Sequence, residues 1–316
     1  MPYIVQFTRA IRWMLGATFL MLLSISPVSA KFIAVSANLN DTFQNMLLLS
    51  MERTADANND DIYIDYANND TDRQLAQIRQ YVQTGADAII VSSIKWDDAE
   101  YTPKIMDITG KTPLVFVSAE PLHDLSKLPK NVIYVGSNEQ ESGTMEMEEL
   151  ARLAHYKGKV AMLMGEKIHR AAQSRSQDVK EVIAKYPDMS LVASETADWS
   201  RSKAYAITKK WLQDKLDFNI LVANNDEMIL GAILAFQDSG IDPKPYLLGG
   251  IDATPDALQE MQKGLLDVTV LQDANRQGSA SVEMAYQLIN KERPAPVYWV
   301  PFKLITPDNY QQLQDK

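Results

Sequence analysis

The chain has 316 residues, of which 31 are lysine or arginine and 41 are aspartate or glutamate, so its formal net charge is −10 at pH 7. This acidity argues against a nucleic-acid partner, because such binding rests on a basic surface. The chain has no cysteine, which excludes disulfides, thiol chemistry and attachment through a lipid-modified cysteine.

The first thirty residues have the pattern of a cleavable secretory signal peptide. Arg9 and Arg12 supply positive charge, residues 13–25 are almost all apolar, and residues 27–30 form a small-residue cleavage site. We expect cleavage between Ala30 and Lys31, which leaves 29 basic and 41 acidic residues and a charge of −12. The alternative, an uncleaved anchor, is disfavoured because a bilayer span needs roughly 20 apolar residues.

From residue 31 onward, short apolar strands alternate with amphipathic helices, which is typical of βαβ units with a parallel sheet. The mature chain is long enough for two domains. In its first half we predict helices at 43–57 and around Leu75, Ile78 and Val82. The strands of this half are predicted at 32–35, 62–66, 88–91, 114–117 and 132–135.

A second, similar series follows. Its predicted helices lie near 172–186, 201–215, 227–239 and 278–290, and its predicted strands lie at 160–163, 191–193, 220–222, 246–248 and 268–271. The tetrapeptide Ala-Asn-Asn-Asp occurs at 67–70 and again at 223–226, although Asn and Asp are also ordinary helix N-caps. No Pro/Gly/Ser-rich linker separates the halves, so we expect a tight crossover near Val135.

Two parallel sheets joined in this way leave a cleft at the carboxyl ends of their strands, where ligands bind in such folds. Amides, carboxylates and one aromatic ring follow the predicted strands, and these groups suit a neutral ligand rich in hydroxyls. Trp199 and Arg175 could complete the site as a stacking wall and a donor fork. The strand-end residues are Asn38, Asn40, Asp41, Phe43, Asn224, Asn225, Asp226, Asp252, Gln272 and Asp273.

Each of these residues also has a plainer interpretation. Asp41, Asp226 and Asp252 precede helices and could simply cap them. Phe43 could belong to the core, and Arg175 could lie on a helix surface. The combination is more informative than any one member.

Motifs of catalysis are missing from the sequence. We find no G-x-S-x-G nucleophile elbow, no Gly-rich phosphate loop and no H-E-x-x-H zinc motif. The three histidines, His123, His155 and His169, are scattered. We therefore expect a protein that is not an enzyme and has no cofactor and no metal site.

Several longer segments resemble the sugar-binding branch of the type I periplasmic binding proteins, namely residues 223–232, 250–258 and 264–274, with shorter matches at 85–90 and 134–137. The resemblance implies an α/β fold of two Rossmann-like lobes joined by a hinge of several crossovers, with the ligand cleft between the lobes. After the signal peptide at 1–30, it implies one lobe of residues 31–135 plus 273–297 and another of residues 136–272 plus 298–316.

The resemblance also implies roles for individual residues. Ligand contacts would come from Asp41 and Phe43 in the first lobe and from Arg175, Trp199, Asn225 and Asp252 in the second, with Gln272 at a hinge crossing. His169 stands where glucose/galactose binders also have a histidine. Asn40 and Ser118 complete the predicted ligand-binding set.

Two subfamilies compete. Residues 164–166 and 299–307 look like the inositol and rhizopine binders, and glucose/galactose or pentose binders are the alternative. Ser118 and Ala119 stand where sugar binders usually have an Asp or Asn followed by Arg or Lys. Ala171 replaces an acid of the glucose/galactose binders, whose calcium loop has no counterpart before Gly158. Glu120, His169 or Lys95 could compensate for the missing charge.

The resemblance implies a monomeric receptor in the periplasm. Its ligand would be a small polyhydroxylated compound such as a monosaccharide or cyclitol, on which the two lobes close about a hinge. The closed receptor would deliver the ligand to an inner-membrane ABC permease. A sensor that signals to a chemoreceptor or a sensor kinase is the alternative. A lac-repressor-type regulator shares the fold, but here a signal peptide replaces the DNA-binding helices.

Overall fold

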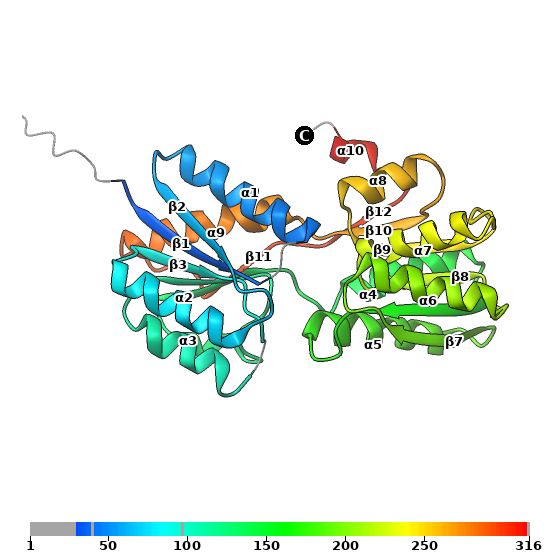
Figure 1. The fold of residues 1–316 in the computed structure, drawn as a ribbon, viewed down its shortest axis with the longest axis horizontal. Helices are drawn as coiled ribbons and strands as arrows, with labels where there is room; N and C mark the ends of the chain where they lie inside the picture. Colours follow the sequence, from blue (N-terminus) through cyan, green and yellow to red (C-terminus); the bar gives the residue numbers. More distant parts are fainter. Residues whose placement is uncertain (1–29, 39–40, 96–97, 315–316) are drawn as a thin grey trace, which may run out of the picture.

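The computed structural model describes residues 30–38, 41–95 and 98–314, and it has two α/β lobes that lie side by side (Figure 1). The predicted signal peptide, apart from Ala30, and the candidate Asn40 lie outside the described residues. Among the helices of the described ranges, none is long and apolar enough to cross a membrane.

The first lobe is built on a six-stranded parallel sheet in the order β2-β1-β3-β4-β5-β11. Helices α1 (Thr42–Asp56) and α9 (Ala274–Ile289) pack together on one face, and α2 (Thr71–Thr84) and α3 (Tyr101–Thr109) pack together on the other. The strands are β1 (Phe32–Ala37), β2 (Asp61–Tyr66), β3 (Ala88–Val91), β4 (Leu114–Val117), β5 (Val132–Gly136) and β11 (Val297–Trp299).

Alternation along the strands explains this layering. In β1, Ile33 and Val35 point into the core under α1 and α9, whereas Ala34 points into the core under α2 and α3. Strands β3 and β4 are buried at every position, as expected for parallel strands covered on both faces. Their continuous apolar runs are therefore a direct consequence of the two helix layers.

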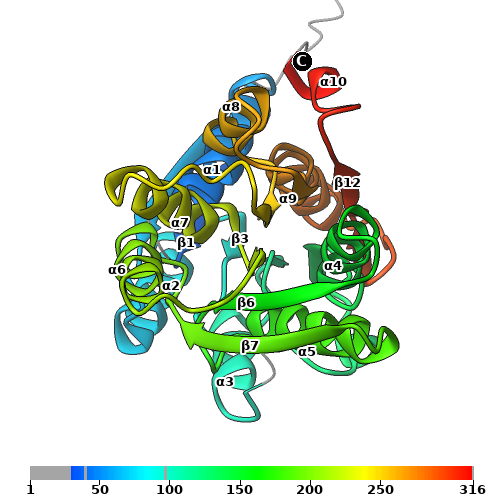
Figure 2. The ribbon, with the colours of Figure 1, turned by 90° about the vertical axis from the view of Figure 1, so that its right-hand side faces the viewer.

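The second lobe repeats the plan with the strand order β7-β6-β8-β9-β10-β12, in which only β12 is antiparallel. One face is covered by α6 (Arg201–Gln213), α7 (Asp226–Asp238) and α8 (Pro255–Gln262), and the other by α4 (Ser142–Leu153) and α5 (Arg170–Lys185). The strands are β6 (Gly158–Met164), β7 (Met189–Thr196), β8 (Ile220–Ala223), β9 (Leu247–Asp252), β10 (Val268–Leu271) and β12 (Lys303–Ile305). Figure 2 looks at this lobe, with β6 beside β7 and the short α10 (Gln311–Gln314) at the periphery.

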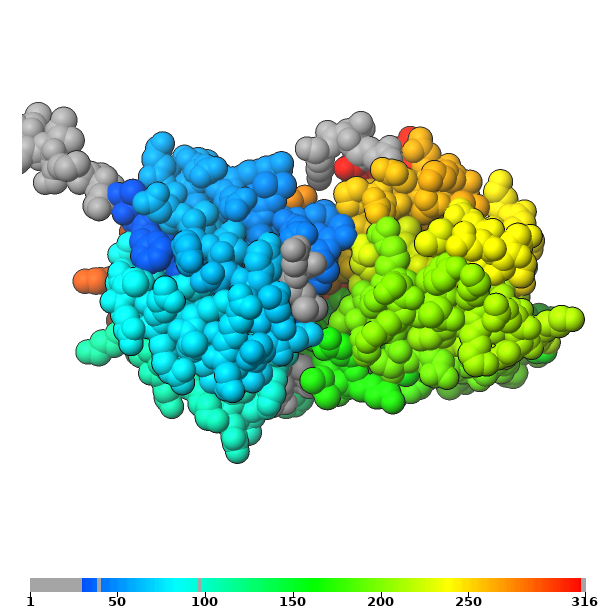
Figure 3. Space-filling view, in the orientation of Figure 1, coloured from blue at the N-terminus to red at the C-terminus, as the bar shows by residue number. Residues whose placement is uncertain are grey.

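The chain passes between the lobes after β5, again after β10, and finally between β11 and β12. The first passage carries it into α4, which packs on β9 and β10 of the second sheet, and the second returns it to α9 on the first sheet. In Figure 1 these connecting segments run from one lobe to the other, coloured green and orange to red. The lobes touch on the face seen in Figure 3.

The observed elements differ from the predicted ones in a few places. The strand predicted at 246–248 is too short, because β9 runs on through Gly249 and Gly250 to Asp252. A Cβ at Gly249 would lie 2.7 Å from Leu150 Cδ1, and one at Gly250 would lie 2.6 Å from Asp226 Oδ1. The glycines therefore mark close packing on both faces of a strand and not a turn. Helices α3, α4, α8 and α10 and strands β11 and β12 were not among the predicted elements.

Candidate functional site

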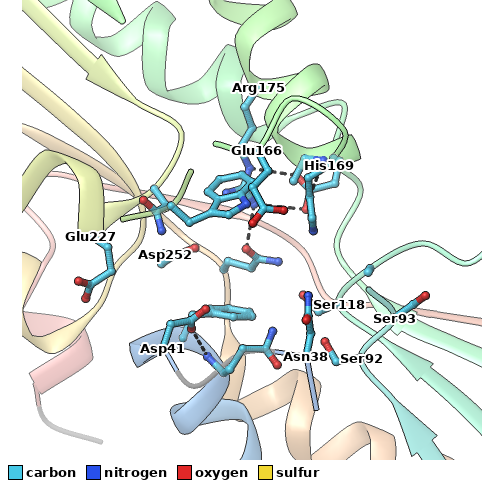
Figure 4. A pocket seen from close by; sticks show the side chains of 18 residues that line it. Asn38, Asp41, Ser92, Ser93, Ser118, Glu166, His169, Arg175, Glu227 and Asp252 are labelled. Atoms are coloured by element: carbon cyan, nitrogen blue, oxygen red, sulfur yellow. Dashed lines mark hydrogen bonds and ion pairs between the residues drawn. The ribbon is translucent and has the colours of Figure 1, made fainter. Parts of the chain in front are cut away.

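A cavity lies between the two lobes, at the carboxyl ends of both sheets, with about 750 Å³ of space that protein atoms leave empty, part of it open to solvent. Figure 4 shows polar side chains of the two lobes facing each other across it. The first lobe contributes Asn38, Asp41, Phe43, Ser92, Ser93 and Ser118, and the second contributes Glu166, His169, Arg175, Trp199, Asn225 and Asp252.

The strand orders explain this position. In the first sheet β1 lies between β2 and β3, so the chain leaves β1 and β3 toward opposite faces and opens a crevice at their carboxyl ends. Asn38 follows β1, and Ser92 and Ser93 follow β3. In the second sheet the same reversal occurs between β6 and β8, which Glu166 and Asn225 follow. Each lobe thus presents its topological switch point to the other.

Arg175 is held rigidly at the centre of the second-lobe wall. Its side chain is nearly fully buried and pairs with Glu139 through Nε at 3.1 Å and Nη2 at 3.2 Å. Its guanidinium also donates to Gln272 Oε1 at 2.9 Å and to the carbonyl of Asn224 at 2.8 Å. Because Glu139 and Gln272 both lie where the chain crosses between lobes, Arg175 ties the cavity wall to the hinge.

Asp252 is the most exceptional carboxylate of the cavity. It is only 5% exposed, and within the described residues its side chain accepts no hydrogen bond. Burial raises the pKa of Asp252 well above its usual range, against the lowering effect of Arg175. A buried carboxylate without donors is unfavourable, so a ligand that brings donors to it is stabilised strongly.

Two other polar side chains cap helices at the rim of the cavity. Asp41 accepts the backbone N–H of Gln44 at 2.8 Å at the start of α1, and Asn225 accepts that of Met228 at 3.1 Å at the start of α7. The capping interpretation is therefore correct for both, yet both also line the cavity. The helix uses one oxygen of each cap, so Asp41 keeps its second carboxylate oxygen as an acceptor for a ligand, and Asn225 keeps its amide nitrogen as a donor.

His169 and Trp199 form an aromatic corner. Their rings meet edge to face with centroids 5.3 Å apart. Burial, with Arg175 nearby, lowers the pKa of His169 to about 4, so the ring is neutral at pH 7. Its Nδ1 accepts the N–H of Ala171 at 3.3 Å, which leaves Nε2 as the protonated, donating nitrogen.

The backbone around the cavity is strained at several lining residues. Ser118, Trp199 and Asp252 have positive φ angles of 65°, 60° and 129°, a region that residues other than glycine rarely adopt. Tyr134 Oη donates to the carbonyl of Ser118 at 3.0 Å and thereby holds one of these turns. Such strain concentrates at ligand sites, where it aims side chains into the cavity.

Polar contacts close the rim between the lobes. Thr42 Oγ1 donates to Glu227 at 2.7 Å, Asn69 Nδ2 donates to Glu166 at 3.1 Å, and Arg170 Nε lies 2.8 Å from Glu120. In each of these contacts the two partners belong to different lobes. The structure is therefore that of a closed pair of lobes.

A family model described as "Periplasmic binding protein domain" matches residues 32–293. The chain belongs to this family of periplasmic binding proteins. A protein of Rhizobium meliloti named for rhizopine binding is 35% identical over 308 residues, which cover 96% of this chain and 99% of the relative. A xylitol-binding protein of Mycolicibacterium smegmatis is 31% identical over 263 residues, covering 82% of this chain and 72% of that one.

Solved structures agree with this assignment. An ABC transporter solute-binding protein from Bacillus halodurans, solved with bound myo-inositol, has a TM-score of 0.83 and 32% identity, and the match covers 90% of this chain and 97% of the other. The type I periplasmic binding protein fold, with its two parallel-sheet lobes, is thereby confirmed for this chain.

The structure brings the predicted site residues together. Apart from Asn40, which lies outside the described residues, every one of them lines the same cavity between the lobes. These residues are Asp41, Phe43, Ser118, His169, Arg175, Trp199, Asn225, Asp252 and Gln272. Their role in ligand binding stays a prediction.

Two residues that follow strands, Asp226 and Glu120, contact other protein groups and do not line the cavity. Asp226 turns inward, where it accepts hydrogen bonds from Thr254 N at 2.7 Å and Thr269 Oγ1 at 2.8 Å. Glu120, one of the candidates to compensate for Ser118 and Ala119, lies near Arg170 of the opposite lobe and does not line the cavity. Neither Asp226 nor Glu120 is placed to contact a ligand directly.

Sequence reasoning missed several lining residues: Gln44, Ser92, Ser93, Glu139, Glu166 and Glu227. Gln44 Oε1 is buried without a hydrogen-bond partner, which makes it available to a ligand. Ser92 and Ser93 directly follow the predicted strand at 88–91, so the strand-end rule could have found them. Within the described part of the chain, no group of three or more His, Asp or Glu side chains is arranged to hold a metal ion.

Proposed function

We propose that this chain is the solute-binding component of an ABC importer, that it works in the periplasm, and that it binds a monosaccharide or a cyclitol, with myo-inositol as the leading compound. The observation that carries the proposal is the cavity between the lobes, where buried acceptors and donors surround two aromatic side chains. The similar solute-binding protein with bound myo-inositol and the xylitol-binding relative support the same ligand class.

The cavity chemistry suits hydroxyl groups. Asp252, Asp41 and Gln44 offer acceptors, while Arg175 and the neutral His169 offer donors, so neighbouring hydroxyls can each donate and accept. Phe43 and Trp199 can cover the C–H faces of a saturated ring. None of these groups needs to make or break a bond, and binding without catalysis is the function that we assign.

Closure is the mechanism. Ligand that docks on one lobe gains contacts from the other only when the lobes approach, and those added contacts stabilise the closed state. From the sequence we expected lobes of residues 31–135 plus 273–297 and residues 136–272 plus 298–316. We now propose that the boundaries lie after Gly136 and after Trp299, because β11 pairs with β5 in the first sheet up to these two residues. The closed surface, formed by both lobes, would then dock on the permease as a monomer.

The proposal is tested by calorimetric titration of the mature chain with myo-inositol, hexoses, pentoses and xylitol. We expect binding of at least one of them with a dissociation constant in the micromolar range or below. The Asp252→Asn variant should lose binding by at least about tenfold, because the amide replaces one acceptor by a donor. Asp226→Asn is the control, since this neighbouring acid faces inward. The absence of heat with every polyol would refute the proposal.

A further inference from the structure

Ser118 lies at the centre of a strained turn on the first-lobe side of the cavity (Figure 4). The N–H of Ala119 donates to the carbonyl of Val117 at 2.7 Å, so the turn spans only three residues. Its central residue, Ser118, has a φ of 65°, whereas the common form of such a turn has a negative φ. A strained turn persists only when its surroundings hold it in place. Whatever holds this turn therefore also shapes the cavity wall.

Tyr134 in β5 contacts the turn directly. Its hydroxyl donates to the carbonyl of Ser118 at 3.0 Å, and the N–H of Ser118 donates to the carbonyl of the next residue, Val135, at 2.9 Å. The Tyr134 side chain is fully buried, and burial raises its pKa well above the usual value, so the hydroxyl keeps the proton that it donates. Both backbone polar groups of Ser118 are thus bound to β5.

Tyr134 can reach Ser118 because residue 136 is a glycine. Residues 134 and 136 of a strand point to the same face of the sheet, and a Cβ on Gly136 would lie only 2.0 Å from the Tyr134 hydroxyl oxygen. The tyrosine ring therefore occupies the place that a side chain at position 136 would need. Gly136 is the last residue of β5, where the chain first leaves for the second lobe. The ring thus lies at the first passage between the lobes.

The third passage between the lobes supports the other side of the ring. Trp299 ends β11, where it pairs with Gly136, and its indole meets the Tyr134 ring edge to face with centroids 5.8 Å apart. Directly after it, the N–H of Val300 donates to the carbonyl of Gly136 at 2.8 Å. Trp299 is 47% exposed and is not among the described residues that line the cavity. Two of the three passages therefore meet at Tyr134.

The segment that follows the turn carries a contact between the lobes. Glu120, two residues beyond Ser118, lies 2.8 Å from Arg170 Nε of the second lobe. The shape of the turn sets the direction in which this segment leaves β4. A change at Ser118 would thus act on the cavity wall and on the contact between the lobes together.

We propose that Tyr134 is a positioning residue that couples the hinge to the cavity: Trp299 holds its ring, and its hydroxyl holds the Ser118 turn in the conformation that binding requires. Opening of the lobes needs rotation at the passages, and rotation at Gly136 or Trp299 changes the space in which the ring lies. The effect on affinity rests on the proposed function, whereas the effect on the turn does not.

The first test needs no ligand. Amide hydrogen exchange of Ser118 and Ala119, followed by NMR in the ligand-free mature chain, measures how firmly the turn is held. Tyr134→Phe removes only the hydroxyl, and we expect both amides to exchange about three- to tenfold faster after the loss of this hydrogen bond. Trp299→Ala should accelerate the same amides about two- to tenfold, because the ring loses its aromatic partner.

The opposite edge of the same sheet provides a matched control. Tyr63 in β2 is 48% exposed and meets the ring of the buried Tyr81 edge to face at 6.2 Å. The Tyr81 hydroxyl donates to the carbonyl of Val35 at 3.1 Å. This pair has the chemistry of the pair at the hinge but lies away from the passages between the lobes. We expect Tyr63→Ala and Tyr81→Phe to leave the exchange of the turn amides unchanged.

Affinity is measured by calorimetric titration with myo-inositol, hexoses, pentoses and xylitol. For the polyol that the parent chain binds, we expect Tyr134→Phe to weaken binding about three- to tenfold and Tyr81→Phe to change it less than about twofold. Ser118→Gly should rescue Tyr134→Phe to within about twofold of Ser118→Gly alone, because glycine adopts a positive φ without strain. Ser118→Ala keeps the strain, so in that background the full loss should remain.

Several results would overturn the inference. Unchanged exchange of the turn amides in Tyr134→Phe would show that the turn holds itself, and an equal acceleration in Tyr81→Phe would show a general loosening of the lobe. Unchanged exchange in Trp299→Ala would separate the turn from the hinge, and this half-exposed position decides the point even if Tyr134→Phe does not fold. Unchanged affinity in Tyr134→Phe would separate the turn from binding. A chain that binds no polyol would refute the proposed function, and the exchange of the turn would still decide this inference.

Discussion

Trp199 depends on a residue far from it in sequence. A Cβ built on Gly165 would lie 2.3 Å from two carbon atoms of the Trp199 indole, so the ring rests directly against the Gly165 backbone. A side chain at position 165 must therefore displace the ring. We predict that Gly165→Ala lowers the affinity for the polyol at least about tenfold in calorimetric titration, with little change of thermal stability, because the ring leaves the cavity wall.

The same substitution in a Trp199→Ala background is the control. Without the indole there is nothing to displace, so the added methyl should change affinity by less than about twofold. If Gly165→Ala reduced affinity equally in both backgrounds, the effect would come from the loop backbone and our explanation would be wrong.

Neighbouring residues with similar chemistry have different tasks, and this limits what sequence can predict. Asn225 lines the cavity and caps α7, while Asp226, the next residue, is fully buried in the second lobe. Both follow the same strand, and only their orientation separates them. A strand-end rule places residues at the correct edge of a sheet but does not say which of two successive side chains faces the ligand.

Asp226 joins three elements, since it starts α7 and accepts hydrogen bonds from Thr254 before α8 and from Thr269 in β10. Burial raises the pKa of Asp226 to about 6, above the unfolded value of about 3.9. Its contribution to stability is thus complete below about pH 4 and is lost as the pH rises through about 6. In the parent chain this loss amounts to up to about 3 kcal/mol of the free energy of unfolding between these pH values. We predict that Asp226→Asn removes this pH dependence, as measured by urea unfolding.

Thr269→Val should act in the opposite direction. The Thr269 hydroxyl lowers the pKa of Asp226, so its removal extends the pH-dependent loss of stability to higher pH. Unfolding curves with the same pH dependence in both variants and the parent chain would contradict this account.

The elements themselves were largely predictable. Strands at 88–91, 114–117 and 268–271 have the predicted bounds, because runs of β-branched residues between polar turns identify buried parallel strands well. Helices α3, α4 and α8 were missed, since they are short or begin without a clear capping signal, as at Glu100 and Glu141. The two-lobe fold did not depend on them.

The candidate site was predictable in part. Asp252 and Asn225 follow strands and carry the resemblance to the family, so sequence found them. Glu139 and Glu166 were missed as site residues because their importance comes from contacts across the fold, with Arg175 and Asn69 respectively. Such pairings are visible only when distant segments have been brought together.

The relative position of the lobes depends on contacts that do not touch the cavity. Arg170, at the start of α5, and Glu120, after β4, lie 2.8 Å apart, with side chains 17% and 8% exposed. Opening of the lobes separates them, so the pair favours the closed form. We predict that Arg170→Gln lowers ligand affinity about three- to tenfold and increases the radius of gyration of the ligand-free protein in X-ray scattering, because Glu120 is then hydrated best in the open form.

Lys210→Gln provides the comparison. Lys210 pairs with Asp214 four residues further along, so both groups belong to a single lobe. This variant should leave affinity and the radius of gyration unchanged. A compact ligand-free Arg170→Gln protein would show that the pair does not govern closure.

The three crossings between lobes have a consequence for how the molecule is made. The first sheet receives its last strand from residues 297–299 and the second from residues 303–305, although each sheet begins much earlier in the chain. Neither core is complete until almost the whole polypeptide is present. For a chain exported as we propose, an emerging nascent segment cannot form a finished lobe, and it therefore stays unfolded enough to pass through a secretion channel until synthesis is nearly over.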